Sequence, residues 1–72
     1  MFVSKLEKES RNIRKQAPSR TTYSTMIIDG EKLFQIQSYS GSGLTDGAKQ
    51  TMQFDKNGAE KLIEILKEEF NL

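Results

Sequence analysis

The sequence TTYSTMII (residues 21–28), followed by Asp29-Gly30 and then by EKLFQIQSY (residues 31–39), decides the fold of this chain. β-branched and aromatic residues dominate the first run, which is typical of a strand. Asp-Gly between two such runs is a strong hairpin signal, because a two-residue type I′ turn needs a positive φ at both positions. We therefore predict two antiparallel strands joined by a tight turn.

A two-residue turn also fixes the register of the hairpin. Counting back from it pairs Ile28 with Glu31, and the later pairs follow in steps of one residue. One side should carry Tyr23, Thr25, Ile27, Phe34 and Ile36 and face the core. The other side should carry Arg20, Thr22, Ser24, Gln35, Gln37 and Tyr39, with Met26 and Leu33 near the turn. The predicted hairpin thus has one apolar and one polar face.

The C-terminal third of the chain predicts one more strand and a helix. Residues 49–54 alternate, which places Met52 and Phe54 on the apolar face, and Lys49, Thr51 and Gln53 on the polar face. Asp55 or Asn57 can cap the following helix, and Asn57 with Glu60 resembles a capping box. The helix has one apolar stripe, formed by Ala59, Leu62, Ile63, Leu66 and Phe70.

These elements predict an α+β fold, with an antiparallel sheet of three to four strands and the C-terminal helix packed on one face. The predicted core comprises Tyr23, Ile27, Phe34, Ile36, Met52, Phe54, Leu62, Ile63, Leu66 and Phe70. Residues 40–48 are rich in glycine and predict a loop, either a plain linker or a binding loop. This loop lacks the Gly-Lys-Ser/Thr ending of a P-loop.

The N-terminal segment, residues 1–19, is interpreted as a helix or a basic arm, and residues 20–72 as a single domain. Phe2, Leu6, Ile13 and Ala17 have roughly helical spacing, but Glu9 and Ser10 interrupt the stripe. Pro18 ends the segment, because the residue before a proline is biased away from helix. Residues 1–20 hold six basic residues against two acidic ones, whereas residues 50–72 hold three against five. A basic head of this kind attracts phosphate.

The composition argues against catalysis and in favour of a binding protein. The 72 residues contain no cysteine and no histidine, which removes disulfides, thiolate metal sites and the commonest zinc ligand. We expect no enzymatic activity, no cofactor and no metal. A chain this short has a marginal core, so we expect a homodimer in which Ile65, Leu66 and Phe70 meet their copies or the partner's sheet. It shows no signal-peptide pattern and no apolar run of about 18 residues, so we expect a cytoplasmic protein without membrane contact.

The polar face is the candidate site, because it joins basic, amide, hydroxyl and aromatic side chains with few acids. Single-stranded nucleic acid is typically held by such a surface, with rings that stack on bases. The predicted binding residues are Arg20, Gln35, Gln37, Tyr39, Lys49 and Thr51 on the face, with Arg11, Arg14 and Lys15 on the arm. The alternative is the ordinary solvated face of an antiparallel sheet.

The last forty residues resemble the positive-cofactor-four-like family of single-stranded-DNA-binding domains. The resemblance rests on FQIQSY (residues 34–39), the glycine loop, KQTMQFD (residues 49–55) and the apolar run at 62–66. It implies a curved sheet, dimers that pair through their helices, and a nucleic acid near Tyr39 and Lys49. The chain departs from the family in having only Lys49 as a basic residue by the loop and no tryptophan in the helix.

The chain also looks like small Lys- and Glu-rich proteins of phages and mobile elements in low-GC bacteria. Many of those bind and inhibit a host enzyme. That resemblance implies the alternative function, binding of a host protein.

Overall fold

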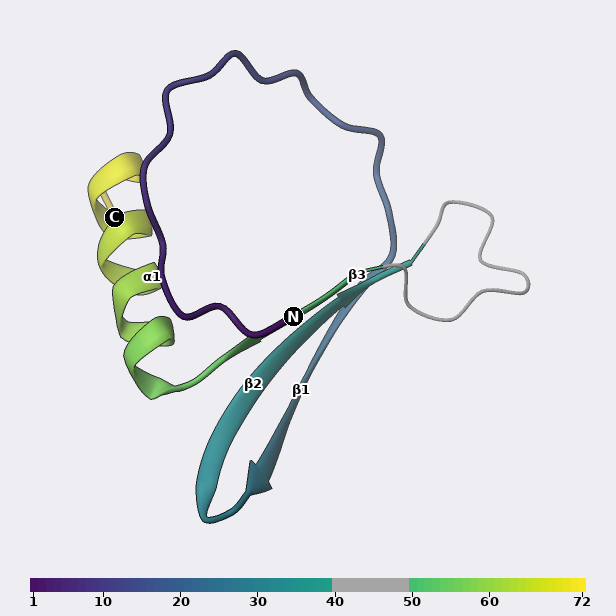
Figure 1. Ribbon diagram of the computed structural model, residues 1–72. Coiled ribbons are helices and arrows are strands. Elements are labelled where there is room, and N and C mark those ends of the chain that lie inside the picture. Colours follow the sequence, from purple (N-terminus) through teal and green to yellow (C-terminus); the bar gives the residue numbers. More distant parts are fainter. Residues whose placement is uncertain (40–49) are drawn as a thin grey trace.

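The computed structural model describes residues 1–39 and 50–72, and it has the predicted α+β architecture. Strands β1 (Thr21–Ile28), β2 (Glu31–Ser38) and β3 (Gln50–Phe54) form an antiparallel sheet in the order β1-β2-β3. Helix α1 (Lys56–Phe70) follows β3 directly (Figure 1). The predicted glycine loop and Lys49 lie outside the described residues.

The β1–β2 hairpin forms at Asp29-Gly30 with the predicted register. Asp29 and Gly30 have φ angles of 53° and 78°, which are the positive values that a two-residue turn of this kind requires. Ile28 pairs with Glu31, Thr25 with Phe34 and Tyr23 with Ile36. The hairpin extends past β3, because β3 pairs only with residues Phe34 to Ser38 of β2.

The N-terminus forms an edge of the sheet that the sequence did not indicate. The Val3 amide donates to the Gln53 carbonyl, and the Gln53 amide donates to the Met1 carbonyl, both at 2.8 Å. Phe2 thereby forms a parallel bridge with Gln53 beside β3. Residues 4–20 have no regular secondary structure and arc from α1 to the start of β1 (Figure 1). Of the two interpretations of residues 1–19, a helix or a basic arm, the helix is therefore wrong, because Glu9 and Ser10 interrupt the only apolar stripe that could have packed.

Both ends of α1 are closed by local hydrogen bonds. Asp55 is the N-cap, and its Oδ1 accepts from the Gly58 amide at 2.8 Å. Asp55 rather than Asn57 therefore takes this position. Asn71 ends the helix in the left-handed conformation, with a φ of 57°, and the Leu72 amide donates to the Lys67 carbonyl.

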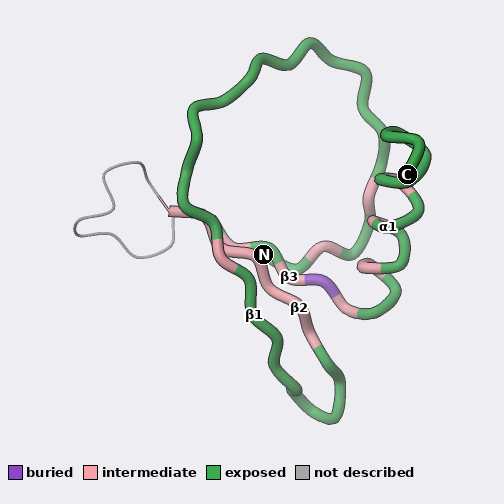
Figure 2. Tube along the Cα trace, turned by 180° about the vertical axis from the view of Figure 1, so that it is seen from behind, coloured by how far each residue is buried: buried purple, intermediate pink, exposed green. Residues whose placement is uncertain are grey.

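Burial is concentrated where β3 meets α1. Among the described residues, Phe54 is the buried hydrophobic one, with 3% of its surface exposed (Figure 2). Phe34, Ile36 and Leu62 of the predicted core are partly buried. The remaining predicted core residues are exposed, and these are Tyr23, Ile27, Met52, Ile63, Leu66 and Phe70.

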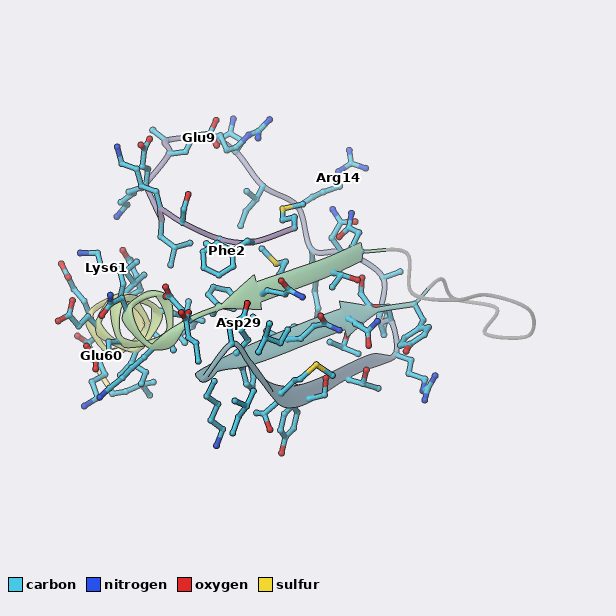
Figure 3. All side chains as sticks on the ribbon, turned by 60° about the horizontal axis from the view of Figure 1, so that its bottom comes forward. Phe2, Glu9, Arg14, Asp29, Glu60 and Lys61 are labelled. Carbon is cyan, nitrogen blue, oxygen red and sulfur yellow. The ribbon has the colours of Figure 1, made fainter. Side chains whose placement is uncertain are left out.

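The direction of α1 explains why the predicted core is only partly closed. Figure 3 looks almost along the axis of α1, which lies beside the end of β3 rather than across the hairpin. Because α1 starts two residues after Phe54, its first turn covers Phe54 while its later turns lead away from the sheet. The apolar stripe therefore exists as predicted, but most of it does not reach the strands.

Candidate nucleic-acid interface

The polar face of the sheet brings together the candidate residues of β2 and β3. We define the polar face as Arg20, Thr22, Ser24, Gln35, Gln37, Tyr39, Thr51 and Gln53. The register places Gln37 between Thr22 and Thr51, and Gln35 between Ser24 and Gln53. Successive side chains of a strand alternate between faces, so these residues project from the same side. The hairpin and β3 together position Gln35, Gln37 and Thr51 as neighbours.

The amide side chains on this face are partly ordered by one another. The Gln53 Nε2 atom donates a hydrogen bond of 2.8 Å to the Gln35 Oε1 atom, in a partly buried setting. Each of these amides keeps further donor or acceptor capacity, because a glutamine has two N–H donors and a carbonyl with two lone pairs. Such a cross-strand pair can present amide groups to a base edge or a phosphate from a fixed position.

Arg20 and Tyr39 form a stacked pair at the open end of the hairpin. The Tyr39 amide donates to the Arg20 carbonyl at 3.0 Å, which continues the hairpin ladder by one pair. The central guanidinium carbon of Arg20 lies 4.7 Å from the centroid of the Tyr39 ring, within the range of a cation–π contact. Arg20 is exposed and Tyr39 is partly buried. The pair thus joins a positive charge and an aromatic ring at one place.

The polar face carries its charge unevenly. Arg20 stands at one end, and Glu31 lies on the same side at the turn, opposite Ile28. Between them the described side chains of the face are uncharged, and near the turn the face becomes apolar at Met26, Ile28 and Leu33. The end with Arg20 and Tyr39 is therefore the part that suits an anionic, base-bearing ligand.

The arm residues are not brought onto this face. Arg11, Arg14 and Lys15 are all exposed and lie on the arc that leaves the sheet (Figure 1). The Arg11 guanidinium lies 3.7 Å from the Glu9 carboxylate. Figure 3 shows Glu9 and Arg14 pointing outward from the arm. Lys49, the remaining candidate, lies outside the described residues.

Two other features are absent from the part of the chain that the structure describes. Residues 1–39 and 50–72 contain no group of three or more acidic, histidine or cysteine side chains that could bind a metal ion. In those same ranges, no helix has the length and apolar character needed to span a membrane.

Comparison with family models, with curated proteins and with solved structures finds no match for the chain. The candidate site is therefore supported by geometry alone.

The sequence predicted the members of the site but not the interactions between them. Arg20 and Tyr39 were each expected on the polar face, yet their stacking was not. The sequence does contain the information that brings them together, since the register that starts at Asp29-Gly30 also pairs residue 20 with residue 39. Gln53 was placed on the face without a binding role, and its hydrogen bond to Gln35 makes it part of the site.

Proposed function

We propose that the protein binds single-stranded nucleic acid through the polar face, without catalysis and as a homodimer. The stacked Arg20–Tyr39 pair is the observation that supports this most directly. Proteins that hold single strands combine aromatic rings, on which bases stack, with cations that attract the backbone. Here one pair of side chains supplies both groups, and the amides of Gln35 and Gln37 continue from it along the sheet.

The roles proposed for the residues follow from their chemistry. The Tyr39 ring stacks on a base through the side that Arg20 does not cover, while Arg20 pairs with the adjacent phosphate. Gln35, Gln37 and Thr51 donate to base edges or to phosphate oxygens. Arg11, Arg14 and Lys15 add sequence-independent attraction from the arm, and Lys49 does so from beside the loop.

The test is fluorescence anisotropy of a labelled oligo-dT at low and high salt. Affinity should fall steeply as salt rises, because each phosphate that the protein neutralises releases a counterion. Tyr39→Ala should cost about 1–3 kcal/mol of binding free energy, which is the usual cost of truncating a stacking ring. Tyr23→Ala is the matched control, because Tyr23 is the other of the two tyrosines and lies on the opposite face.

Both variants should be measured at a protein concentration that keeps them in the same oligomeric state. Equal affinity of the Tyr39→Ala and wild-type proteins would contradict the proposed role of the ring. No binding by the wild-type protein at low salt would contradict the function as a whole.

A second candidate function is supported by the open edge of the sheet. Within residues 1–39 and 50–72, β1 is an edge strand, and Thr21–Ile28 contains no charged residue and no proline, the usual protections of such an edge. A protein partner could add a strand here, as in β-augmentation. The partner implied by this candidate is a host protein that the chain inhibits. Its binding should depend much less on salt than oligonucleotide binding does.

A further inference from the structure

Among the described residues, two apolar surfaces close to the junction of β3 and α1 are left uncovered. On the sheet, Tyr23 and Ile27 of β1 are 75% and 70% exposed. On α1, Ile63, Leu66 and Phe70 are 52%, 40% and 69% exposed. We call the first surface the apolar face, comprising Tyr23, Thr25, Ile27, Phe34, Ile36, Met52 and Phe54. We call the second the open stripe, comprising Ala59, Ile63, Leu66 and Phe70.

The apolar face and the open stripe meet in a hollow. The hollow has a volume of about 280 Å³, and its lining includes Thr25, Phe34, Phe54 and Ala59, with the charged residues Lys32, Asp55 and Lys56 also contributing. The open stripe leads away from Ala59 along one side of α1, because residues three and four apart lie on the same side of a helix. The two surfaces therefore form the walls of one apolar corner, and Phe54 lies where they join.

The neighbouring flank of α1 is partly covered by the arm, and the two line a hollow of about 410 Å³. Leu62 and Ile65 line this second hollow together with Leu6 of the arm, and all three are partly buried. The Lys8 Nζ atom donates to the Glu69 carboxylate at 3.1 Å on the same flank. Ile65, which we expected at a dimer interface, therefore faces the arm, and the stripe that remains open is narrower than the sequence indicated.

The chain exposes more surface than a compact monomer of its mass, as expected of a chain whose apolar surfaces lack a partner. The chain exposes 6703 Å², whereas a compact monomer of this mass exposes about 4,500 Å². Its radius of gyration is 14.3 Å, against about 11 Å for a compact chain of this length. The arm accounts for part of the excess. A typical stable interface buries about 800 Å² on each partner, which is less than the excess of exposed surface in this chain.

We propose that the apolar corner is occupied by a second copy of this chain, whose α1 lies on the apolar face. At the apolar corner, each chain presents one uncovered sheet surface and one uncovered helix stripe. A two-fold axis lets the open stripe of each chain cover the apolar face of the other. Both apolar surfaces of both chains are then buried in one symmetric interface. This inference rests on the homodimer in the proposed function. It is tested without nucleic acid, so its failure is distinct from a failure to bind oligonucleotide.

Sedimentation velocity from micromolar to hundred-micromolar protein is the first test. The wild-type protein should be a dimer at tens of micromolar. Ile63→Lys should weaken dimerisation by about tenfold or more, because it places a charge among the apolar side chains of the open stripe and the apolar face. Glu64→Lys is the matched control, since Glu64 is the next residue of α1 and lies off the open stripe. Circular dichroism should show whether each variant keeps its helix.

Disulfide trapping is the second test, and it needs no destabilising charge. The chain has no cysteine of its own. A disulfide between two single-cysteine variants therefore shows that the two substituted positions lie close together in the dimer. Ile63→Cys mixed with Ile27→Cys should form mixed dimers on mild oxidation, whereas Glu64→Cys mixed with Ile27→Cys should not.

The inference is overturned if the wild-type protein is a monomer, or if Ile63→Lys and Glu64→Lys dimerise equally well. Disulfides that form only between two Ile63→Cys chains would also overturn it. They would mean that the two helices pair with each other and that neither lies on the partner's sheet.

Discussion

One face of the sheet carries mainly polar side chains and the other mainly apolar ones. The two faces also differ in how far contacts within the same chain pair or cover these side chains. On the polar face, Gln53 bonds to Gln35 and Arg20 stacks on Tyr39, while the remaining groups can bond to water. On the apolar face, Tyr23 stacks on Phe34 with ring centroids 5.6 Å apart, but Phe54 alone among the described residues is a buried hydrophobic side chain. Alternation along the strands thus predicts which face is apolar, without predicting whether the same chain covers it.

The largest effect on stability should come from Phe54, the buried residue of the apolar face. Phe54→Ala should lower the free energy of unfolding by about 3–5 kcal/mol, as for other buried phenylalanines. Much of the stability of so small a domain would then disappear. Phe34→Ala is the matched comparison on the neighbouring strand. At a protein concentration low enough to keep the chain monomeric, it should cost less, because Phe34 is only partly buried in the single chain. Urea denaturation of both variants measures the difference.

A larger destabilisation by Phe34→Ala than by Phe54→Ala at that low concentration would break the comparison. At higher concentrations, where the proposed second copy covers the apolar face, the cost of Phe34→Ala should rise.

A smaller effect is expected on the polar face, where the amide pair can be tested by a double-mutant cycle. Gln35→Ala, Gln53→Ala and the double variant should give a coupling energy of about 0.5–1.5 kcal/mol, typical of one hydrogen bond between neutral groups. Denaturation of the four proteins gives this energy. A coupling of zero would mean that the 2.8 Å hydrogen bond between the two amides does not contribute to stability.

The smallest effect on stability is expected from the arm. Replacing Arg11, Arg14 and Lys15 by alanine should leave the melting temperature unchanged, because all three side chains are exposed. The variant should bind oligo-dT more weakly at low salt. Its salt dependence should also be shallower, by up to about 0.7 in slope for each phosphate that the arm no longer neutralises.

The control for the arm removes the same charge from elsewhere. Lys56, Lys61 and Lys67 of α1, replaced together by alanine, lower the net charge equally. If this control weakens binding as much as the arm variant does, the arm acts only through net charge. A salt slope unaffected by the arm variant would show that the arm neutralises no phosphate.

Local rules in the sequence were sufficient for the hairpin, its register, the third strand and the stripe of the helix. Asp29-Gly30 permits the positive φ angles of a two-residue turn, and the alternation that follows sorts each side chain to a face. For the same reason the membership of the candidate site in β2 and β3 could be predicted. These features depend on neighbours in the chain or directly across a short turn.

The tertiary structure alone decided the direction of α1, the position of the N-terminus and the interactions within the site. The pairing of Met1–Val3 with β3 joins segments some fifty residues apart, and nothing in the first three residues encodes that choice of edge. The stripe on α1 showed that the helix needs an apolar partner, but the backbone path at Asp55 determined which surface it reaches. The hydrophobic effect is non-directional. A pattern of apolar residues therefore predicts that a surface will be buried, but the long-range geometry of the fold determines which surface buries it.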